Sequence, residues 1–252
     1  MKNEELKIVP PVILHSEFLL RNSNFSTEAR DTPPRSLATL GMTCLALVLL
    51  SGCRTIRHVP EGTPLTPLTS SNASDAAQQL AARRSQFRGE RSLIRLRLPN
   101  GVSARAQLQV DPSLRMMLTV YTPIGTTAAR LYSAAGDVVF INDLEKTAWR
   151  GRATELGGAL DTFATEAAAL LIIGLPPGGD AALSYSPAGL ARASLADVII
   201  RFDPPSYPPQ HVTIARGEQQ IEIDHLESVE GSETLRAPEV PGNYRCCVAP
   251  QL

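Results

Sequence analysis

The side chains in this chain that could do chemistry are its thiols and imidazoles, and their spacing gives them few partners. The 252 residues include four cysteines and four histidines. Cys246 and Cys247 are adjacent, so a disulfide between them is strained, and the histidine nearest to them in sequence is His225. His211 and His225 fall at the ends of predicted strands, without the spacing of a metal site or a catalytic triad. The sequence therefore predicts no catalytic residue, no metal site, no cofactor and no enzymatic activity.

Cys53 is preceded by residues that indicate a role for its thiol. It ends the stretch LALVLLSGC, in which an apolar run leads into two small residues. Residues 37–50, which follow the positive charge of Arg35, suit the apolar part of a secretory signal, about 7–15 residues long. A membrane-spanning helix needs roughly 20 apolar residues. Residues 1–52 are therefore predicted to be a leader and signal peptide.

The LSGC that ends at Cys53 resembles a bacterial lipobox. The resemblance implies that Cys53 becomes the first residue of the mature protein and carries acyl chains on its sulfur and amino group. Because each buried methylene contributes about 0.8 kcal/mol, several chains make such an anchor practically permanent. Arg54 follows the cysteine, where lipoproteins retained in the inner membrane usually carry Asp. The expected location is the outer membrane, lipid-anchored and facing the periplasm.

Residues 1–35 differ from the short basic start of a signal peptide, because they hold five acidic residues and four prolines. Two interpretations stay open. In the first, translation starts at a position further along the chain. In the second, this segment is a disordered leader.

Residues 53–72 are rich in proline, serine and threonine, which predicts a semi-extended, lipid-anchored tether. A helix is predicted to follow, capped by Ser74 or Asp75 and ending at Gly89. The folded body is predicted to span residues 73–228.

From Ser92 onward apolar residues recur at every second position, which is the period of half-buried strands. LIRLRL and SARAQLQV show this alternation, separated by the turn signal PNG. About ten to eleven such strands are predicted, with Leu96, Leu108 and Leu118 on the apolar face. Asp143 and Glu145 flank a predicted turn, where exposed carboxylates are expected.

Short helices are predicted over residues 156–163 and 167–173, the second ended by GLPP. A long sheet with one apolar face must close, stack or be covered. The predicted fold is mainly β with a helical lid (α+β): an incomplete antiparallel β-barrel whose apolar cavity is capped by short helices. Residues 229–252 contain prolines without a period and are predicted to be a loosely packed C-terminal tail.

The charge balance argues against nucleic-acid binding. The chain has 24 basic and 25 acidic residues, a formal net charge of −1. We expect no nucleic-acid partner and a monomeric protein.

Between Arg88 and Ile141 the sequence resembles the N-terminal half of LolB and the wider LolA/LolB-like lipoprotein superfamily. The most similar piece is LTVYTPIGTTAARL, which corresponds to a strand, a Pro-Leu-Gly-Ser/Thr loop and the next strand of the family. GLPP after the apolar helix is a second, weaker match. The resemblance covers about residues 73–226, and the order of the motifs together with the lipobox carries it.

The resemblance implies an incomplete barrel that receives lipoprotein acyl chains and delivers them to the outer membrane. It places the membrane-transfer loop on Pro123, Ile124 and Gly125, with isoleucine in place of the family's leucine. The implied partners are outer-membrane lipids, lipoprotein acyl chains and a periplasmic LolA-like carrier. The residues expected to line the acyl-chain cavity are Leu96, Ala106, Leu108, Met116, Leu118 and Trp149.

A second function is also compatible with the sequence. An apolar concavity on a lipid-anchored domain could dock another envelope protein, which would make the chain a structural or assembly lipoprotein.

Overall fold

The computed structural model describes residues 61–155, 165–231 and 233–246. All of them belong to one unit of the chain, Arg54–Leu252. The predicted signal peptide, the predicted acylation of Cys53 and the helix predicted over residues 156–163 lie outside the described residues and stay predictions.

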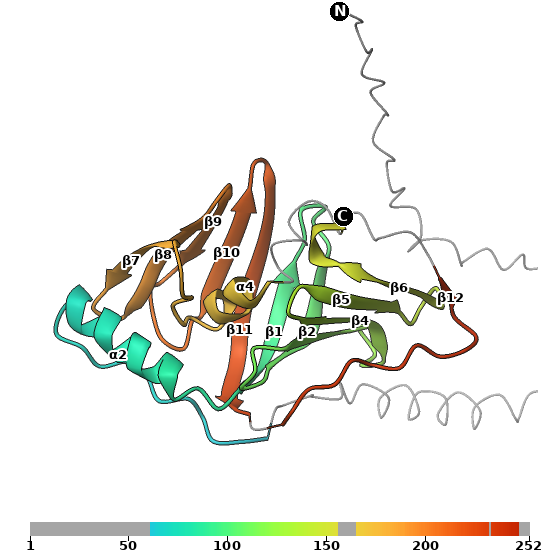
Figure 1. Ribbon diagram of the computed structural model, residues 1–252, viewed down its shortest axis with the longest axis horizontal. Coiled ribbons are helices and arrows are strands. Elements are labelled where there is room, and N and C mark those ends of the chain that lie inside the picture. The colour runs from blue at the N-terminus through green and yellow to red at the C-terminus, as the bar shows by residue number, and fades with distance from the viewer. Residues whose placement is uncertain (1–60, 156–164, 232, 247–252) are drawn as a thin grey trace, which may run out of the picture. The chain divides into compact units, whose positions relative to one another are not determined.

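One sheet of twelve strands carries the fold (Figure 1). Its order is β12-β6-β5-β4-β3-β2-β1-β11-β10-β9-β8-β7, so within the described residues β12 and β7 are the edges of an open sheet. Neighbouring strands are antiparallel except β12 and β6. The strands are β1 Glu90–Arg97, β2 Ser103–Val110, β3 Met116–Tyr121, β4 Thr127–Ala134, β5 Asp137–Asn142, β6 Thr147–Arg152, β7 Ala182–Ser186, β8 Gly189–Leu195, β9 Val198–Phe202, β10 His211–Arg216, β11 Gln219–Glu230 and β12 Arg245–Cys246.

This open, mainly antiparallel sheet confirms the predicted fold class. Two strands had no clear signal in the sequence. Strand β8 reads GLARASL, whose small residues hide the alternation, although Leu190 and Ala193 are buried. Strand β12 has only two residues, too few for any period.

The helices of the described residues are short. Helix α2, Ala73–Ser85, lies against β7 and β8, and helix α4 spans Glu166–Ile172. A 3-10 turn, η2, covers Ala153–Glu155. The N-cap of α2 is Asn72, not the predicted Ser74 or Asp75, because its Oδ1 accepts a 2.9 Å hydrogen bond from the amide of Asp75.

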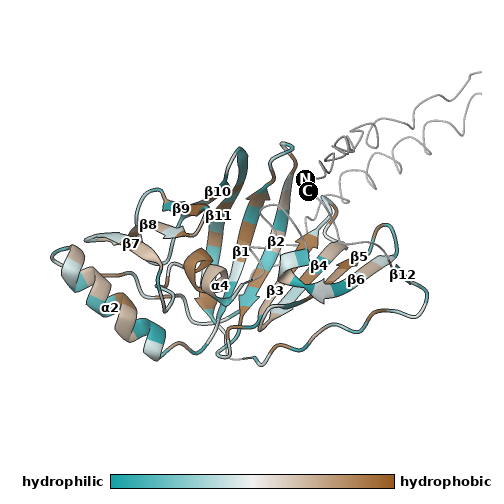
Figure 2. Ribbon diagram, turned by 45° about the horizontal axis from the view of Figure 1, so that its top comes forward, coloured by the Kyte–Doolittle hydropathy of each residue, from teal (hydrophilic) through white to brown (hydrophobic). Residues whose placement is uncertain are grey.

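The main core lies between α4 and one face of the sheet, here called the inner face. Alternate residues of β1 and β2 are buried there, as their two-residue period predicts. Residues 168–172 of α4 are buried in the same cluster. Figure 2 shows that α4 is mostly hydrophobic where it lies over the sheet. Because residues 168–172 are all apolar, their burial against the sheet removes this run from water.

The opposite face, here called the outer face, is covered over β4, β5 and β6 by residues 233–246. The amide of Leu235 donates to Asp111 Oδ2 at 3.0 Å, and the hydroxyl of Tyr244 donates to Asp143 Oδ1 at 2.8 Å. Leu235 and Tyr244 are therefore attached to the sheet, and the prediction of a loosely packed tail is wrong at these two positions. Leu235 packs in a second buried cluster with Tyr132, Val139, Ile141 and Ala148.

The predicted tether is also partly attached to the body. Pro64 forms a β-bridge with Val229, and the amide of Glu230 donates to the carbonyl of Thr63 at 2.8 Å. The amide of Leu68 donates to the carbonyl of Tyr207 at 3.0 Å. A free tether can therefore include no more than residues 54–62, a correction to the predicted range of 53–72.

Candidate functional site

The turn between β3 and β4 holds the predicted membrane-transfer loop. The amide of Gly125 donates to the carbonyl of Thr122 at 2.9 Å, and Gly125 has a φ of 87°, a conformation that favours glycine. The amide of Thr122 donates to the carbonyl of Thr126 at 2.8 Å, which closes the turn. Pro123 and Ile124 form its tip, and Ile124 is 78% exposed. The backbone is thus satisfied locally while the isoleucine points into solvent.

Two further exposed aliphatic residues lie on turns at the same end of the sheet. In an antiparallel meander every second turn falls at the same end of the strands, so the β1–β2, β3–β4 and β5–β6 turns lie at one end of the sheet. Val102 follows the first of these turns and is 52% exposed, and Leu144 lies on the third and is 65% exposed. This end of the sheet therefore presents three aliphatic side chains to solvent.

The residues predicted to line an acyl-chain cavity all lie in the main core. Leu96, Ala106, Leu108, Met116, Leu118 and Trp149 are buried in the cluster that also holds α4. Helix α4 occupies the inner face beside them. An acyl chain could reach these six side chains only if α4 moved away from the sheet.

A chain of polar side chains runs through this apolar core from β1 to β11. Ser92 donates to Glu90 Oε1 at 2.6 Å, and its oxygen lies 2.8 Å from the hydroxyl of Ser228. The Ser228 hydroxyl lies 3.4 Å from Nδ1 of His225. Glu90 Oε2 and His225 Nε2, at the two ends, are buried without a hydrogen-bond partner among the described residues. The inner face therefore encloses two ionisable groups in a poorly solvated environment.

Burial shifts both of these groups toward their neutral forms. Desolvation raises the pKa of Glu90 to about 8, against the opposing hydrogen bonds from Ser92 and Ser228. Desolvation lowers the pKa of His225 to about 4, opposed by the backbone of Ile172 and the charge of Asp224. The sequence placed His225 at the end of a strand, but β11 continues beyond it to Glu230. His225 faces inward because the alternation of β11 continues to it from Ile223.

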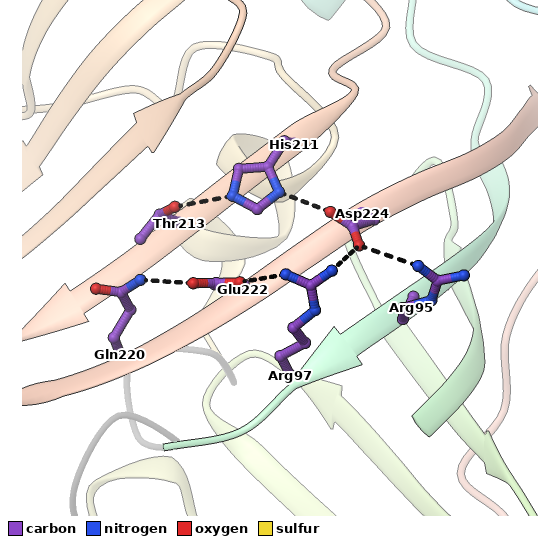
Figure 3. Close-up of polar contacts among 7 residues, drawn as sticks. All are labelled: Arg95, Arg97, His211, Thr213, Gln220, Glu222 and Asp224. Atoms are coloured by element: carbon purple, nitrogen blue, oxygen red, sulfur yellow. Dashed lines mark hydrogen bonds and ion pairs between the residues drawn. The ribbon is translucent and has the colours of Figure 1, made fainter. Parts of the chain in front are cut away.

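A polar network covers the outer face of β1, β10 and β11 (Figure 3). Asp224 is its centre, because Oδ2 lies 3.4 Å from Nη2 of Arg97 and 3.8 Å from Nη1 of Arg95. Its other oxygen, Oδ1, lies 2.7 Å from Nδ1 of His211. Arg97 also donates to Glu222 Oε2 at 2.9 Å. Two guanidinium groups and an imidazole therefore share the Asp224 carboxylate.

His211 thus has partners that its sequence spacing did not reveal. Its Nε2 lies 3.2 Å from Oγ1 of Thr213, so Asp224, His211 and Thr213 form a line. An acid–imidazole–hydroxyl line can activate a nucleophile, provided that donors stabilise the oxyanion. Strand β10 is paired on both sides, with β9 and β11, so its backbone amides are used in hydrogen bonds to these strands and are not free to stabilise an oxyanion. This line fits a structural network better than a catalytic one.

The turn carboxylate Asp143 also differs from its prediction. Its side chain is 14% exposed and lies 2.9 Å from Nη2 of Arg130. Desolvation acts to raise the pKa of Asp143, but the hydrogen bonds from Arg130 and Tyr244 and the charges of Arg130 and Lys146 together lower it below its ordinary value. Asp143 therefore binds the C-terminal segment through Tyr244 and is not simply an exposed charge.

Three sizeable cavities are bounded by described residues. One of about 560 Å³ lies at the end of α2, beside Arg83 and Tyr207. A second of about 430 Å³ lies on the outer face near Ala237. The third, of about 220 Å³, lies between β2 and the β3–β4 turn, beside Arg105 and Pro123. None of these three is lined by the six predicted cavity residues.

Neither a metal cluster nor a membrane-spanning helix is found in the part of the chain that the structure describes. There, His, Cys, Asp and Glu side chains form no group of three or more that could hold a metal ion. No helix in the same residues is long and apolar enough to cross a bilayer.

The fold is thus an open, mainly antiparallel half-barrel. A short apolar helix lies on its inner face, and the β3–β4 turn presents an aliphatic side chain at one end of the sheet. A LolA superfamily protein from Nitrosomonas europaea is similar in structure, with 10% identity over 63% of this chain and 95% of that chain and a TM-score of 0.38. An uncharacterized conserved protein from Thermus thermophilus is 11% identical over 68% of this chain and 98% of that chain, with a TM-score of 0.37. No family model matches the chain, and no curated protein does either.

Proposed function

We propose that this protein is an outer-membrane lipoprotein that receives the acyl chains of other lipoproteins and inserts them into the membrane, as LolB-like receptors do. The observation that carries the proposal is the exposed Ile124 side chain on a turn whose backbone is closed by hydrogen bonds. No catalytic group is needed, because transfer between two apolar environments breaks no covalent bond. A periplasmic LolA-like carrier is the expected donor of the cargo.

The energetics of Ile124 suit a reversible contact with a bilayer. Burying such a side chain in an apolar phase contributes about 1.5–3 kcal/mol, one to two decades in a partition constant. That is too little to hold a protein permanently on a membrane. It is enough to bias the orientation of a protein that is already tethered there.

The cargo site is proposed between α4 and the inner face. The buried ionisable groups of that space, Glu90 and His225, favour their neutral forms, so an acyl chain would meet uncharged and mainly apolar walls. Helix α4 has seven residues and a Thr165 cap, and helices of this length owe their stability mainly to packing. Cargo that replaces the contacts of α4 with the sheet can therefore displace it.

Thr63, where the tether joins the sheet, and Ile124 lie at opposite ends of the sheet. Thr63 bonds to Glu230, which pairs with Glu90 at the start of β1, whereas the Ile124 turn lies beyond Arg97 at its end. Seven steps along β1 span about 23 Å. The ten steps from Cys53 to Thr63 reach at most about 35 Å. An acylated Cys53 and Ile124 can therefore touch the same membrane only with the free tether nearly extended.

The test is transfer of a fluorescently labelled lipoprotein to liposomes by Ile124→Asp. The expected result is a loss of transfer with the melting temperature and fatty-acid binding unchanged, because the side chain is 78% exposed. Leu226→Asp is the matched control, since Leu226 is 44% exposed on a strand bulge away from the turn. Normal transfer by Ile124→Asp, or an equal loss in Leu226→Asp, would overturn the proposal.

Native mass spectrometry separates this function from docking of another envelope protein. A carrier should retain lipid from the membrane extract, and a variant that fills the inner face should lose it. A domain that is always empty but pulls down one envelope protein would favour the docking function instead.

A further inference from the structure

The 220 Å³ cavity next to the Ile124 turn is lined by positively charged side chains. Arg95 and Arg105 contribute from β1 and β2, Tyr121 from β3, and Pro123 from the turn itself. Pro123 is the residue before Ile124, so the cavity opens directly beside the exposed aliphatic tip. An ionic surface and an apolar tip thus meet at one place on the molecule.

The two arginines are forced together by the strand register. Arg95 lies directly opposite Arg105 in the pairing of β1 with β2, and Arg105 lies opposite Tyr121 in the pairing of β2 with β3. Like charges directly across a ladder are destabilising unless something negative lies between them. The sheet therefore maintains a repulsive pair at the mouth of a cavity.

The described carboxylates neutralise this pair only in part. Among the described residues no carboxylate forms an ion pair with Arg105, and its side chain is exposed. Within those residues the carboxylate paired with Arg95 is Asp224, at 3.8 Å, and Asp224 is shared with Arg97 and His211. Among these described side chains there are three arginines, at 95, 97 and 105, and two carboxylates, at 222 and 224, which leaves one positive charge in excess. Two of the three arginines, Arg95 and Arg105, line the cavity.

We propose that this cavity binds the phosphodiester of an anionic phospholipid headgroup when the protein meets a membrane. Guanidinium groups present forked N–H donors that match phosphate oxygens, so Arg105 and Arg95 would hold the phosphate between them. The bound headgroup would place Ile124 at the start of the acyl region. The inference shares with the proposed function only the assumption that this turn contacts lipid.

A general attraction of basic side chains to an anionic surface is the competing explanation. Arg192 offers the matched control, because it is exposed on the same outer face and forms no ion pair with a described carboxylate. It lies on β8, five strands away from the cavity wall at β2 in the sheet order, and it does not line the cavity. Arg105→Gln and Arg192→Gln remove the same charge and differ only in place.

The experiment uses residues 54–252, the unit that holds all described residues, so that neither an acyl anchor nor the apolar residues 37–50 dominate binding. Co-flotation is measured with phosphatidylcholine vesicles, with and without phosphatidylglycerol, at about 0.1 M salt. Arg105→Gln should weaken binding to the phosphatidylglycerol vesicles about fivefold, the effect of roughly one basic side chain at a membrane surface. Arg192→Gln should change it less than twofold, and binding to pure phosphatidylcholine should change little in either variant.

Equal losses in the two arginine variants would overturn the proposal in favour of diffuse attraction. Binding of inorganic phosphate that depends on Arg105, without any preference for phosphatidylglycerol vesicles, would overturn it in favour of a soluble anion. Ile124→Asp tests the proposed function separately. It should reduce binding to both kinds of vesicle, while lipoprotein transfer that stays normal in that variant would refute the carrier function and leave the Arg105 comparison valid.

Discussion

The hydroxyl of Ser92 donates a 2.6 Å hydrogen bond to Glu90 inside the core, and the second oxygen of that carboxyl has no partner among the described residues. A carboxylate left half-satisfied in an apolar environment favours its protonated form, which is why burial raises the pKa of Glu90 to about 8. This pair links the stability of the domain to pH.

The pH dependence has a definite sign. Between the ordinary value of 4.5 and about 8, the folded protein holds one more proton on Glu90 than the unfolded chain, so stability falls as pH rises. His225, with its pKa lowered from 6.5 to about 4, acts in the opposite direction only between those two values. Between pH 6.5 and 8, Glu90 therefore changes the stability with pH and His225 does not.

The resulting prediction concerns Glu90→Gln. The wild type should lose unfolding free energy between pH 6.5 and 8, by up to about 1.4 kcal/mol per pH unit, whereas the variant should not. Urea denaturation at several pH values measures both slopes. Parallel slopes would show that Glu90 does not take up a proton on folding.

A second prediction concerns the inner face as a cargo site. Leu118→Gln places a bulky polar group in the main core and should reduce binding of a fluorescent fatty acid at least tenfold. Ile141→Gln is the control, because Ile141 is also buried but belongs to the outer cluster under the C-terminal segment. Both variants should lose a similar amount of stability, and equal fatty-acid binding in the two would exclude the inner face as the site.

A third prediction concerns the C-terminal segment. Leu235→Ala should cost about 2–3 kcal/mol of unfolding free energy, since Leu235 is 8% exposed and fills the second cluster. Val240→Ala, at a position that is 38% exposed, should cost less than about 0.5 kcal/mol. Chemical denaturation measures both changes. If Leu235→Ala is as mild as Val240→Ala, the segment does not hold the outer face.

A fourth prediction concerns the reach of the tether. Deleting four residues from 55–60 leaves six steps to Thr63, about 21 Å, which is less than the length of β1. The acylated protein should then deliver cargo poorly to the membrane that holds it. A Cys53→Ser form with the same deletion should transfer to liposomes as well as undeleted Cys53→Ser. Equal delivery by long and short acylated forms would place Ile124 outside the transfer step.

Much of the fold follows from local patterns. The two-residue period identifies β1 to β3 and their buried faces, since side chains of a strand alternate whatever the strand pairs with. The same reasoning, carried back from Ile94, would have put Glu90 on the inner face. The turn at Pro123 and Gly125 is equally local, because the two residues restrict or permit the φ values that it needs.

The remaining features depend on partners far away in the sequence. Arg95 meets Arg105 and Asp224 only because β1 pairs with β2 on one side and with β11 on the other, and β11 lies more than a hundred residues later. Residues 233–246 carry no period, so their place depends on the apolar surface of β4 to β6 and on the hydrogen bonds to Asp111 and Asp143. The sequence by itself determined which side chains turn inward on strands with a clear two-residue period, such as β1 to β3, because alternation is a property of the backbone. The tertiary structure decided which side chains lie opposite one another, because register is set by the contacts that bury the whole sheet.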